Sequence, residues 1–211
     1  MSPPSEDFVV IIGDIVGSRE LPDRAVAQDT LRAAVADFNR WEGNGLEAPL
    51  KPTGGDEVKA ITRDPAAAID VITRISDALH PIVLAWGIGR GPLVTSWVPD
   101  VGDLDGPCFH RARQAVERAS TASIWAEVSG FSAVDDSVVN ALLRLVGVIR
   151  NSWSDRQIQY IRSVRTRSQR ETAEAFEVTE SAVSQSLQSA RFHDVENAEG
   201  ALRQVLGTYR A

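Results

Sequence analysis

The segment that most constrains the fold is Phe8-Val-Val-Ile-Ile12, a continuous run of aromatic and β-branched side chains that ends at Gly13-Asp14. Such a run predicts a strand that is buried on both faces. A helical apolar period follows over residues 22–41. Two short strands, at 46–52 and 58–61, then flank the turn Thr53-Gly-Gly-Asp-Glu57, as in a hairpin. We therefore expect a sheet assembled around an early central strand.

Helices and strands continue to alternate as far as residue 128. Their pattern predicts a helix over 65–79, a strand over 82–89, a helix over 107–119 and a strand near 124–128. The order βαββαβ, then αβ, is typical of an α+β domain of the ferredoxin-like or palm type. We place this domain at residues 7–130, with antiparallel pairs in its sheet and its helices on one face.

An all-α domain is predicted at residues 152–211. Residues 131–136 form a linker, and a connecting helix over 137–151 joins the two domains. Beyond it, apolar periodicity predicts helices at 155–164, 169–176, 180–191 and 197–206, and Ser154, Ser168 and Thr179 are suitable N-caps for the first three. Small Ala173 and apolar Val178, Val183 and Leu187 suit a helix-turn-helix.

Composition limits the location and the partners of the chain. Its apolar runs fall far short of the roughly 20 residues that a membrane span requires, so we expect a cytoplasmic protein with no membrane partner. Its single cysteine, Cys108, cannot form an internal disulfide. The net charge of −7 lies entirely within residues 1–151, because acidic and basic side chains balance over residues 152–211. Any basic surface for nucleic acid therefore belongs to the C-terminal domain.

Two acidic residues stand at neighbouring positions of the predicted sheet. Asp14 ends the first strand and Asp56 lies in the hairpin turn beside it. Carboxylates at one edge can hold a hard cation such as Mg²⁺, which would bridge to a triphosphate. The alternative is that Asp14 caps the next helix and that Asp56 is an ordinary turn residue.

Four blocks of sequence resemble the SatD family. They are Gly13-Asp-Ile-Val-Gly-Ser-Arg19, Thr53-Gly-Gly-Asp-Glu-Val58, Trp86-Gly-Ile-Gly-Arg-Gly91 and Asp105-Gly-Pro-Cys-Phe-His-Arg-Ala-Arg113. Over about residues 8–130, the same blocks more distantly resemble class III nucleotide cyclases and GGDEF diguanylate cyclases. The resemblance implies a palm-like domain that binds a nucleoside triphosphate or a cyclic nucleotide.

The cyclase resemblance also implies roles for individual residues. Asp14 and Asp56, with the Ile15 carbonyl, would bind Mg²⁺ or Mn²⁺, and Arg113 would be the catalytic arginine. Phe109 stands where the cyclases have an asparagine, and His110 is the alternative occupant. The nucleotide-binding residues implied by these blocks are Ser18, Arg19, Gly54, Gly55, Glu57 and Gly89. For Gly89, close packing against a neighbouring helix is an equal alternative.

The C-terminal helices resemble sigma-70 region 4 and related DNA-binding regulators. The resemblance implies that the helix at 180–191 would meet double-stranded DNA through side chains able to bond bases or phosphates. The predicted DNA-binding residues are Arg165, Arg167, Arg170, Thr179, Ser181, Ser184, Gln185 and Gln188. The alternative is a helix-turn-helix used only for packing or dimerisation, because the helix contains no lysine.

Three hypotheses remain. The first is a regulator in which a nucleotide- and Mg²⁺-binding palm is coupled to a DNA-binding helix-turn-helix. The second is a nucleotide cyclase or nucleotidyltransferase that the helix-turn-helix localises. The third is a degenerate palm that serves as a dimerisation scaffold. Phe109 favours binding over chemistry, and the two-protomer sites of cyclases imply a homodimer.

Overall fold

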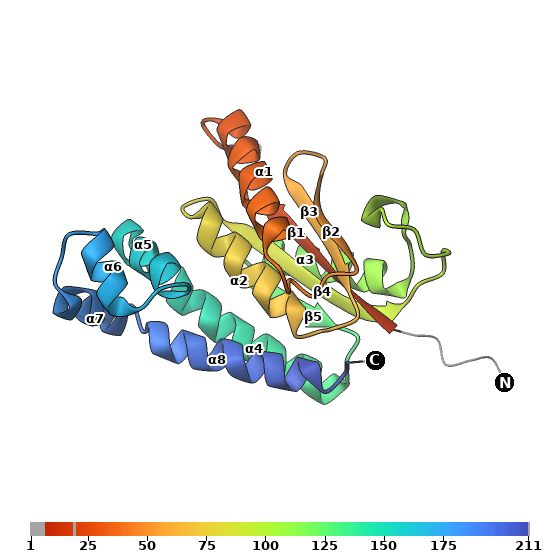
Figure 1. The fold of residues 1–211 in the computed structure, drawn as a ribbon. Coiled ribbons are helices and arrows are strands. Elements are labelled where there is room, and N and C mark those ends of the chain that lie inside the picture. The colour runs from red at the N-terminus through yellow and green to blue at the C-terminus, as the bar shows by residue number, and fades with distance from the viewer. Residues whose placement is uncertain (1–6, 19, 211) are drawn as a thin grey trace.

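A computed structural model describes residues 7–18 and 20–210 and confirms the α+β fold class (Figure 1). In this part of the chain, one five-stranded sheet has the order β2-β3-β1-β4-β5. β1 lies at its centre and pairs antiparallel with β3 and β4, whereas β5 runs parallel to β4. The strands are β1 (Asp7–Ile15), β2 (Ala48–Thr53), β3 (Glu57–Thr62), β4 (Leu84–Pro92) and β5 (Ala126–Ser129).

Helices cover both faces of the sheet, so the expectation of helices on one face is wrong. Val9 and Ile11 of β1 share an apolar cluster with α1 (Arg24–Arg40) and α2 (Ala67–Leu79). Val10 and Ile12 face α3 (Pro107–Thr121) on the other side. The physical reason lies in the sequence of β1, because a strand that is apolar at every position must bury both of its faces.

Six further helical segments precede or follow the last strand. A short 3₁₀ turn, η1 (Val101–Asp103), leads towards α3. After β5 come α4 (Ala133–Arg150), α5 (Asp155–Val164), α6 (Gln169–Ala175), α7 (Glu180–Ser189) and α8 (Phe192–Gly207). Ser154, Ser168 and Thr179 accept the predicted capping hydrogen bonds. No helix within the described ranges is both long and apolar enough to cross a membrane.

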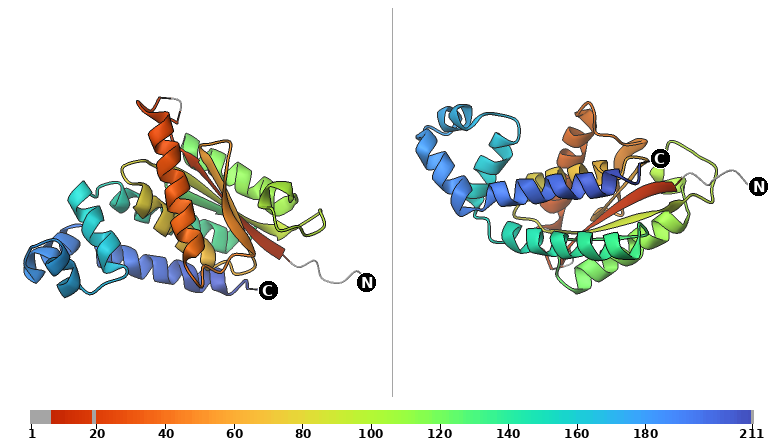
Figure 2. Two further views of the ribbon diagram at one scale, coloured as in Figure 1. Left: turned by 45° about the horizontal axis from the view of Figure 1, so that its top comes forward. Right: turned by 90° about the horizontal axis from the view of Figure 1, so that it is seen from below.

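Two helix starts differ from the prediction. α4 begins at Ala133 rather than at residue 137, because the Ser132 hydroxyl accepts a hydrogen bond from the backbone N–H of Asp135. α8 begins at Phe192 rather than at residue 197. The longer α8 runs back along α4, and the right-hand view of Figure 2 shows the two helices side by side.

The apolar core is continuous across the predicted domain boundary. The cluster that contains Ile11 and Trp86 of the sheet also contains Trp153, Val183 and Leu202 of the C-terminal helices. α8 contacts both α4 and α2, and α5 also contacts α2. The C-terminal helices therefore share their core with the helix layer on one face of the sheet.

Candidate functional site

Three carboxylates meet where β1 ends and β3 begins. Asp14 and Glu57 are paired positions in the antiparallel β1–β3 ladder. The backbone N–H of Ile15 donates to the backbone carbonyl of Asp56 at 3.0 Å. Asp14, Ile15, Asp56 and Glu57 therefore lie at one edge of the sheet, and we name the three carboxylates the acidic edge.

Cationic and hydroxyl groups hold two of these carboxylates. Ser18 Oγ donates to Asp56 Oδ2 at 2.7 Å, and Arg24 Nη2 of α1 donates to the same oxygen at 3.1 Å. On the α3 side, Arg113 donates to Glu57 Oε2. Thr53 Oγ1 also donates to Glu57, at 2.9 Å. The edge thus combines acids from two strands with guanidinium groups from two helices.

The three acids differ in their electrostatic surroundings. Burial of Asp14 raises the pKa of its carboxyl, and repulsion from Asp56 and Glu57 raises it further, while Arg113 offsets only part of the effect. Burial also acts to raise the pKa of Glu57, but hydrogen bonds from Arg113 and Thr53 hold it below its usual value. Asp14 is therefore the acid whose negative charge is least compensated.

The donor chemistry of the acidic edge fits a hard divalent cation. Magnesium prefers carboxylate and other oxygen ligands and often takes only one or two carboxylates from the protein. Asp14 and Asp56 offer such oxygens, and a cation between them would relieve the repulsion at Asp14. Within residues 7–18 and 20–210, no group of three or more His, Cys, Asp or Glu side chains is arranged to hold a metal ion. Any cation here would therefore depend on ligands beyond these side chains.

The glycines and the arginine predicted to bind nucleotide have different positions relative to the acidic edge. Gly54 and Gly55 form the turn beside Asp56 with φ of +63° and +93°, which favour glycine. Arg19 lies outside the described residues. Gly89 packs against α3, where an added Cβ would lie 2.2 Å from the backbone nitrogen of Ala112. Its assignment to nucleotide binding is wrong, because the α3 backbone covers the position.

The two residues that could occupy the cyclase asparagine position, Phe109 and His110, both lie away from the acidic edge. Phe109 is 9% exposed and belongs to the apolar cluster between the sheet and α3. His110 is exposed on the outside of α3, with its imidazole 3.7 Å from Asp105. Neither side chain is among the contacts of the acidic edge. The sequence analysis did not predict that Arg24 contacts Asp56. The one sign in the sequence was a basic residue in the first turn of the helix that follows β1.

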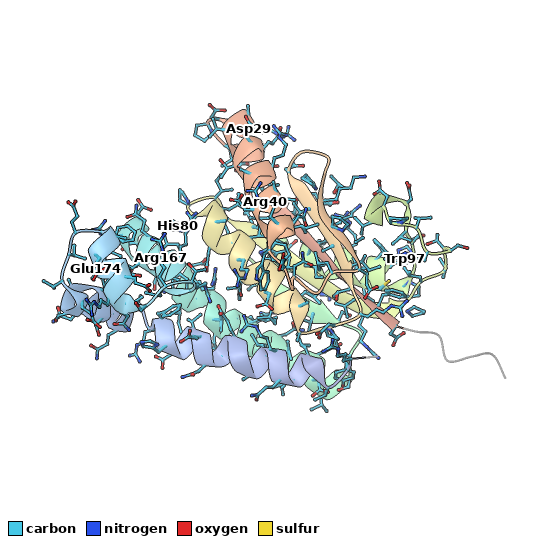
Figure 3. The ribbon with its side chains drawn as sticks, in the orientation of Figure 1. Asp29, Arg40, His80, Trp97, Arg167 and Glu174 are labelled. Atoms are coloured by element: carbon cyan, nitrogen blue, oxygen red, sulfur yellow. The ribbon has the colours of Figure 1, made fainter. Side chains whose placement is uncertain are left out.

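The predicted DNA-binding side chains of α7 all lie on its outer face. Thr179, Ser181, Ser184, Gln185 and Gln188 are exposed, whereas Val183 and Leu187 are buried. Arg167 and Arg170 are exposed as well. Figure 3 shows Arg167 and Glu174 at the end of the molecule that lies farthest from Trp97.

Arg165 is a correction to the predicted DNA-binding set. Its side chain is only 14% exposed, and its guanidinium binds Asp77 of α2 at 2.5 Å and Glu199 of α8 at 3.0 Å. Burial works against its charge, but these two carboxylates outweigh that effect and raise the pKa of Arg165. A side chain committed to two buried acids cannot also reach a phosphate.

The chain is similar to several solved structures and to one protein family. No curated protein matches the chain. A bacterial light-regulated adenylyl cyclase superposes on 60% of this chain and 77% of its own with 16% identity and a TM-score of 0.47, and a second such structure covers 61% and 44% with 14% identity and a TM-score of 0.45. A regulator of polyketide synthase expression from Bifidobacterium adolescentis covers 94% and 85% with 16% identity and a TM-score of 0.26. The model of the SatD family matches residues 8–195, and the chain therefore belongs to the SatD family.

Proposed function

We propose that this protein binds a nucleotide together with Mg²⁺ or Mn²⁺ at the acidic edge and transmits that state to DNA through α7, as a cytoplasmic transcriptional regulator. Nucleotide binding is supported above all by the only partly compensated charge of Asp14 beside Asp56 and Glu57, with Arg24 and Arg113 adjoining. Carboxylates poised for a cation and guanidinium groups poised for an anion together suit a metal–phosphate ligand.

Each side chain has a distinct task in this proposal. Asp14 and Asp56 would hold the cation, and a bound cation would supply positive charge that bridges the carboxylates to phosphate oxygens. Arg113 and Arg24 now bind Glu57 and Asp56, and each retains guanidinium N–H groups that can donate to a phosphate. Ser18 orients the Asp56 carboxylate through its hydrogen bond.

Binding is better supported than catalysis. Class III cyclases, which the N-terminal blocks resemble, use a polar asparagine where this chain has Phe109, and Phe109 is part of the apolar core. Incubating the protein with each nucleoside triphosphate and Mg²⁺ or Mn²⁺, followed by chromatography, separates the two functions. Recovery of unchanged nucleotide is expected, whereas a cyclic or nucleotidyl product would favour the enzyme.

Thermal unfolding tests the nucleotide half. A ligand at one hundred times its Kd stabilises the folded state by about 2.7 kcal/mol, which corresponds to a rise of about 5–10 °C in Tm for a chain of this size. The Asp56→Asn variant should lose the Mg²⁺-dependent part of this rise. Asp29→Asn, at an exposed acid of α1 that pairs only locally with Arg32, should retain it.

The outcome of that experiment is decisive for the site. An unchanged rise in Asp56→Asn would contradict metal-assisted binding at the acidic edge. If no nucleoside triphosphate or cyclic nucleotide raises the Tm of the unmodified protein, the palm has no nucleotide function and the scaffold hypothesis replaces the proposal.

The DNA half is supported by the exposed polar face of α7 and by the exposed Arg167 and Arg170 nearby. Amide and hydroxyl side chains on one helix face suit the major groove, and arginines beside them suit the phosphates. The neutral balance of residues 152–211 limits non-specific attraction, so binding should depend on a particular sequence.

Binding-site selection at low salt with the full-length protein tests this half. Arg167→Ala should weaken binding to all selected sequences alike and lower the salt dependence by about 0.9 log unit per log unit of salt. Gln185→Ala should instead relax discrimination at one base pair by about 1–3 kcal/mol. Arg40→Ala, at an exposed arginine on α1, is the matched control and should change neither. If the selection enriches no sequence, the DNA half of the proposal fails.

A further inference from the structure

α4 exposes an apolar stripe on the surface of the protein. Among the described residues, nine large hydrophobic side chains are exposed, and four of them lie on this helix. Val134 is 71% exposed, Val138 55%, Leu145 64% and Val148 71%. Exposed apolar residues are ordinarily scattered, so four along one helix require an explanation.

The spacing of the stripe is that of a coiled-coil seam. With Ala141, which is also exposed, its members are Val134, Val138, Ala141, Leu145 and Val148, separated by steps of four, three, four and three residues. Alternating steps of three and four keep apolar side chains on one seam that faces a second helix. Val139, Leu143 and Val146, on the opposite side of α4, already belong to the core. The helix therefore has two apolar faces and buries only one of them.

We propose that the stripe binds the same stripe of a second copy of this chain, with the two α4 helices antiparallel around a two-fold axis at Ala141. Such pairing is isologous, so one surface is enough to form a closed dimer. It places Val134 opposite Val148 of the partner subunit and Val138 opposite Leu145 of the partner subunit. The small side chain of Ala141 lets the two backbones approach at the centre.

The polar and apolar flanks of the stripe select the antiparallel orientation. Ser137 and the exposed Arg144 each precede a seam residue and lie on one flank, whereas Leu142 and Ile149 each follow one and lie on the other. Antiparallel pairing about a two-fold axis keeps each flank beside its own copy, so Arg144 lies opposite Ser137 of the partner subunit. Parallel pairing would instead set Arg144 beside Ile149 of the partner subunit and would align the two helix dipoles. The interface requires neither nucleotide nor DNA, so a result that contradicts the dimer does not contradict the proposed function.

Sedimentation velocity of the full chain tests the surface. Leu145→Lys places a charge in the seam and should raise the dimer dissociation constant more than about tenfold. Val94→Lys makes the same change at a residue that is 70% exposed in a loop, and it should leave the dissociation constant unchanged. If the unmodified protein is entirely monomeric at about 100 μM, the proposal is overturned, because an interface weaker than this would not be specific. A dimer that survives Leu145→Lys would overturn it as well.

Oxidative cross-linking tests the orientation and does not depend on how well Leu145→Lys folds. Cys108 is buried, so an introduced cysteine is the accessible thiol. Ala141→Cys should cross-link to the partner subunit, because both copies lie at the two-fold axis. Val134→Cys should not, because its two copies would lie about 21 Å apart along the helices, far beyond the roughly 7 Å limit between the Cα atoms of a disulfide. Cross-linking through Val134→Cys, or none through Ala141→Cys, would refute the antiparallel pairing.

Discussion

At the scale of single residues, Asp14 shows how a site can work against stability. Burial and two neighbouring carboxylates raise its pKa, so the folded protein binds the proton of this acid more tightly than the unfolded chain does. A raised folded-state pKa favours folding below the unfolded value of 3.8, and this advantage is lost as the pH rises through the folded-state pKa. At neutral pH the charged Asp14 therefore destabilises the free protein.

Asp14→Asn should raise the stability of the free protein at pH 7, because it removes the repulsion without changing the shape of the side chain. The gain in Tm over the unmodified protein should shrink as the pH falls through the folded-state pKa of Asp14 and should vanish below pH 3.8. Paired thermal unfolding curves across that range measure the difference. A gain that is independent of pH would show that the Asp14 charge is not its source.

Gly89 illustrates a second residue-scale constraint, the approach of one backbone to another. A Cβ at this position would lie 2.2 Å from the Ala112 nitrogen and 2.3 Å from the Cys108 carbonyl oxygen. Gly89→Ala should therefore lower the free energy of unfolding by about 1–3 kcal/mol or more, because backbone atoms cannot move aside. Urea unfolding measures the loss.

Gly200→Ala is the matched control for that substitution. A Cβ on Gly200 of α8 would meet no atom within 4 Å. In a helix, alanine is favoured over glycine by about 0.5–1 kcal/mol, so this variant should be slightly more stable than the unmodified protein. Equal effects at the two glycines would contradict the packing of β4 against α3.

At the scale of elements, a buried group of four charges joins the helices. Asp77 of α2, Arg150 of α4, Arg165 at the end of α5 and Glu199 of α8 form four ion pairs, with distances of 2.5–3.4 Å. The Arg150 guanidinium also lies over the Trp125 ring, 4.4 Å from its centroid. These contacts set where the C-terminal helices sit on the sheet layer.

Arg165→Met should be among the most damaging single substitutions. It keeps the length of the side chain but leaves Asp77 and Glu199 with one cation fewer, and breaking a buried pair costs about 3–5 kcal/mol. Arg170→Met, at an arginine whose side chain is 79% exposed, should change the free energy of unfolding by less than about 0.5 kcal/mol. Denaturant titration compares them, and similar values would contradict the buried position of Arg165.

At the scale of the whole molecule, the shared core predicts that the C-terminal helices cannot fold alone. Val183, Leu187 and Leu202 belong to one apolar cluster with the sheet residues, and Arg165 and Glu199 depend on Asp77. A fragment of residues 152–211 should show no cooperative melting by circular dichroism, whereas the full chain should melt in one transition. A cooperative transition in the fragment would contradict this expectation and support the separate domain predicted from the sequence.

The sequence by itself determined the features that rest on local chemistry. The helix starts at Ser154, Ser168 and Thr179 followed from side chains that bond the next turn, and the buried central strand followed from the run Phe8–Ile12. The meeting of Asp14 with Asp56 was also predictable, because a hairpin beside the first strand has few places to pair.

Only the tertiary structure decided the features that depend on distant partners. Arg165 looked like its exposed neighbours Arg167 and Arg170, yet its acids are 88 and 34 residues away in the chain. Gly89 suited close approach of a ligand or of a helix equally well, and the structure shows the backbone of α3 packed against it. A cap is satisfied within one turn of its own helix, whereas burial and charge pairing depend on which segments the whole fold brings together.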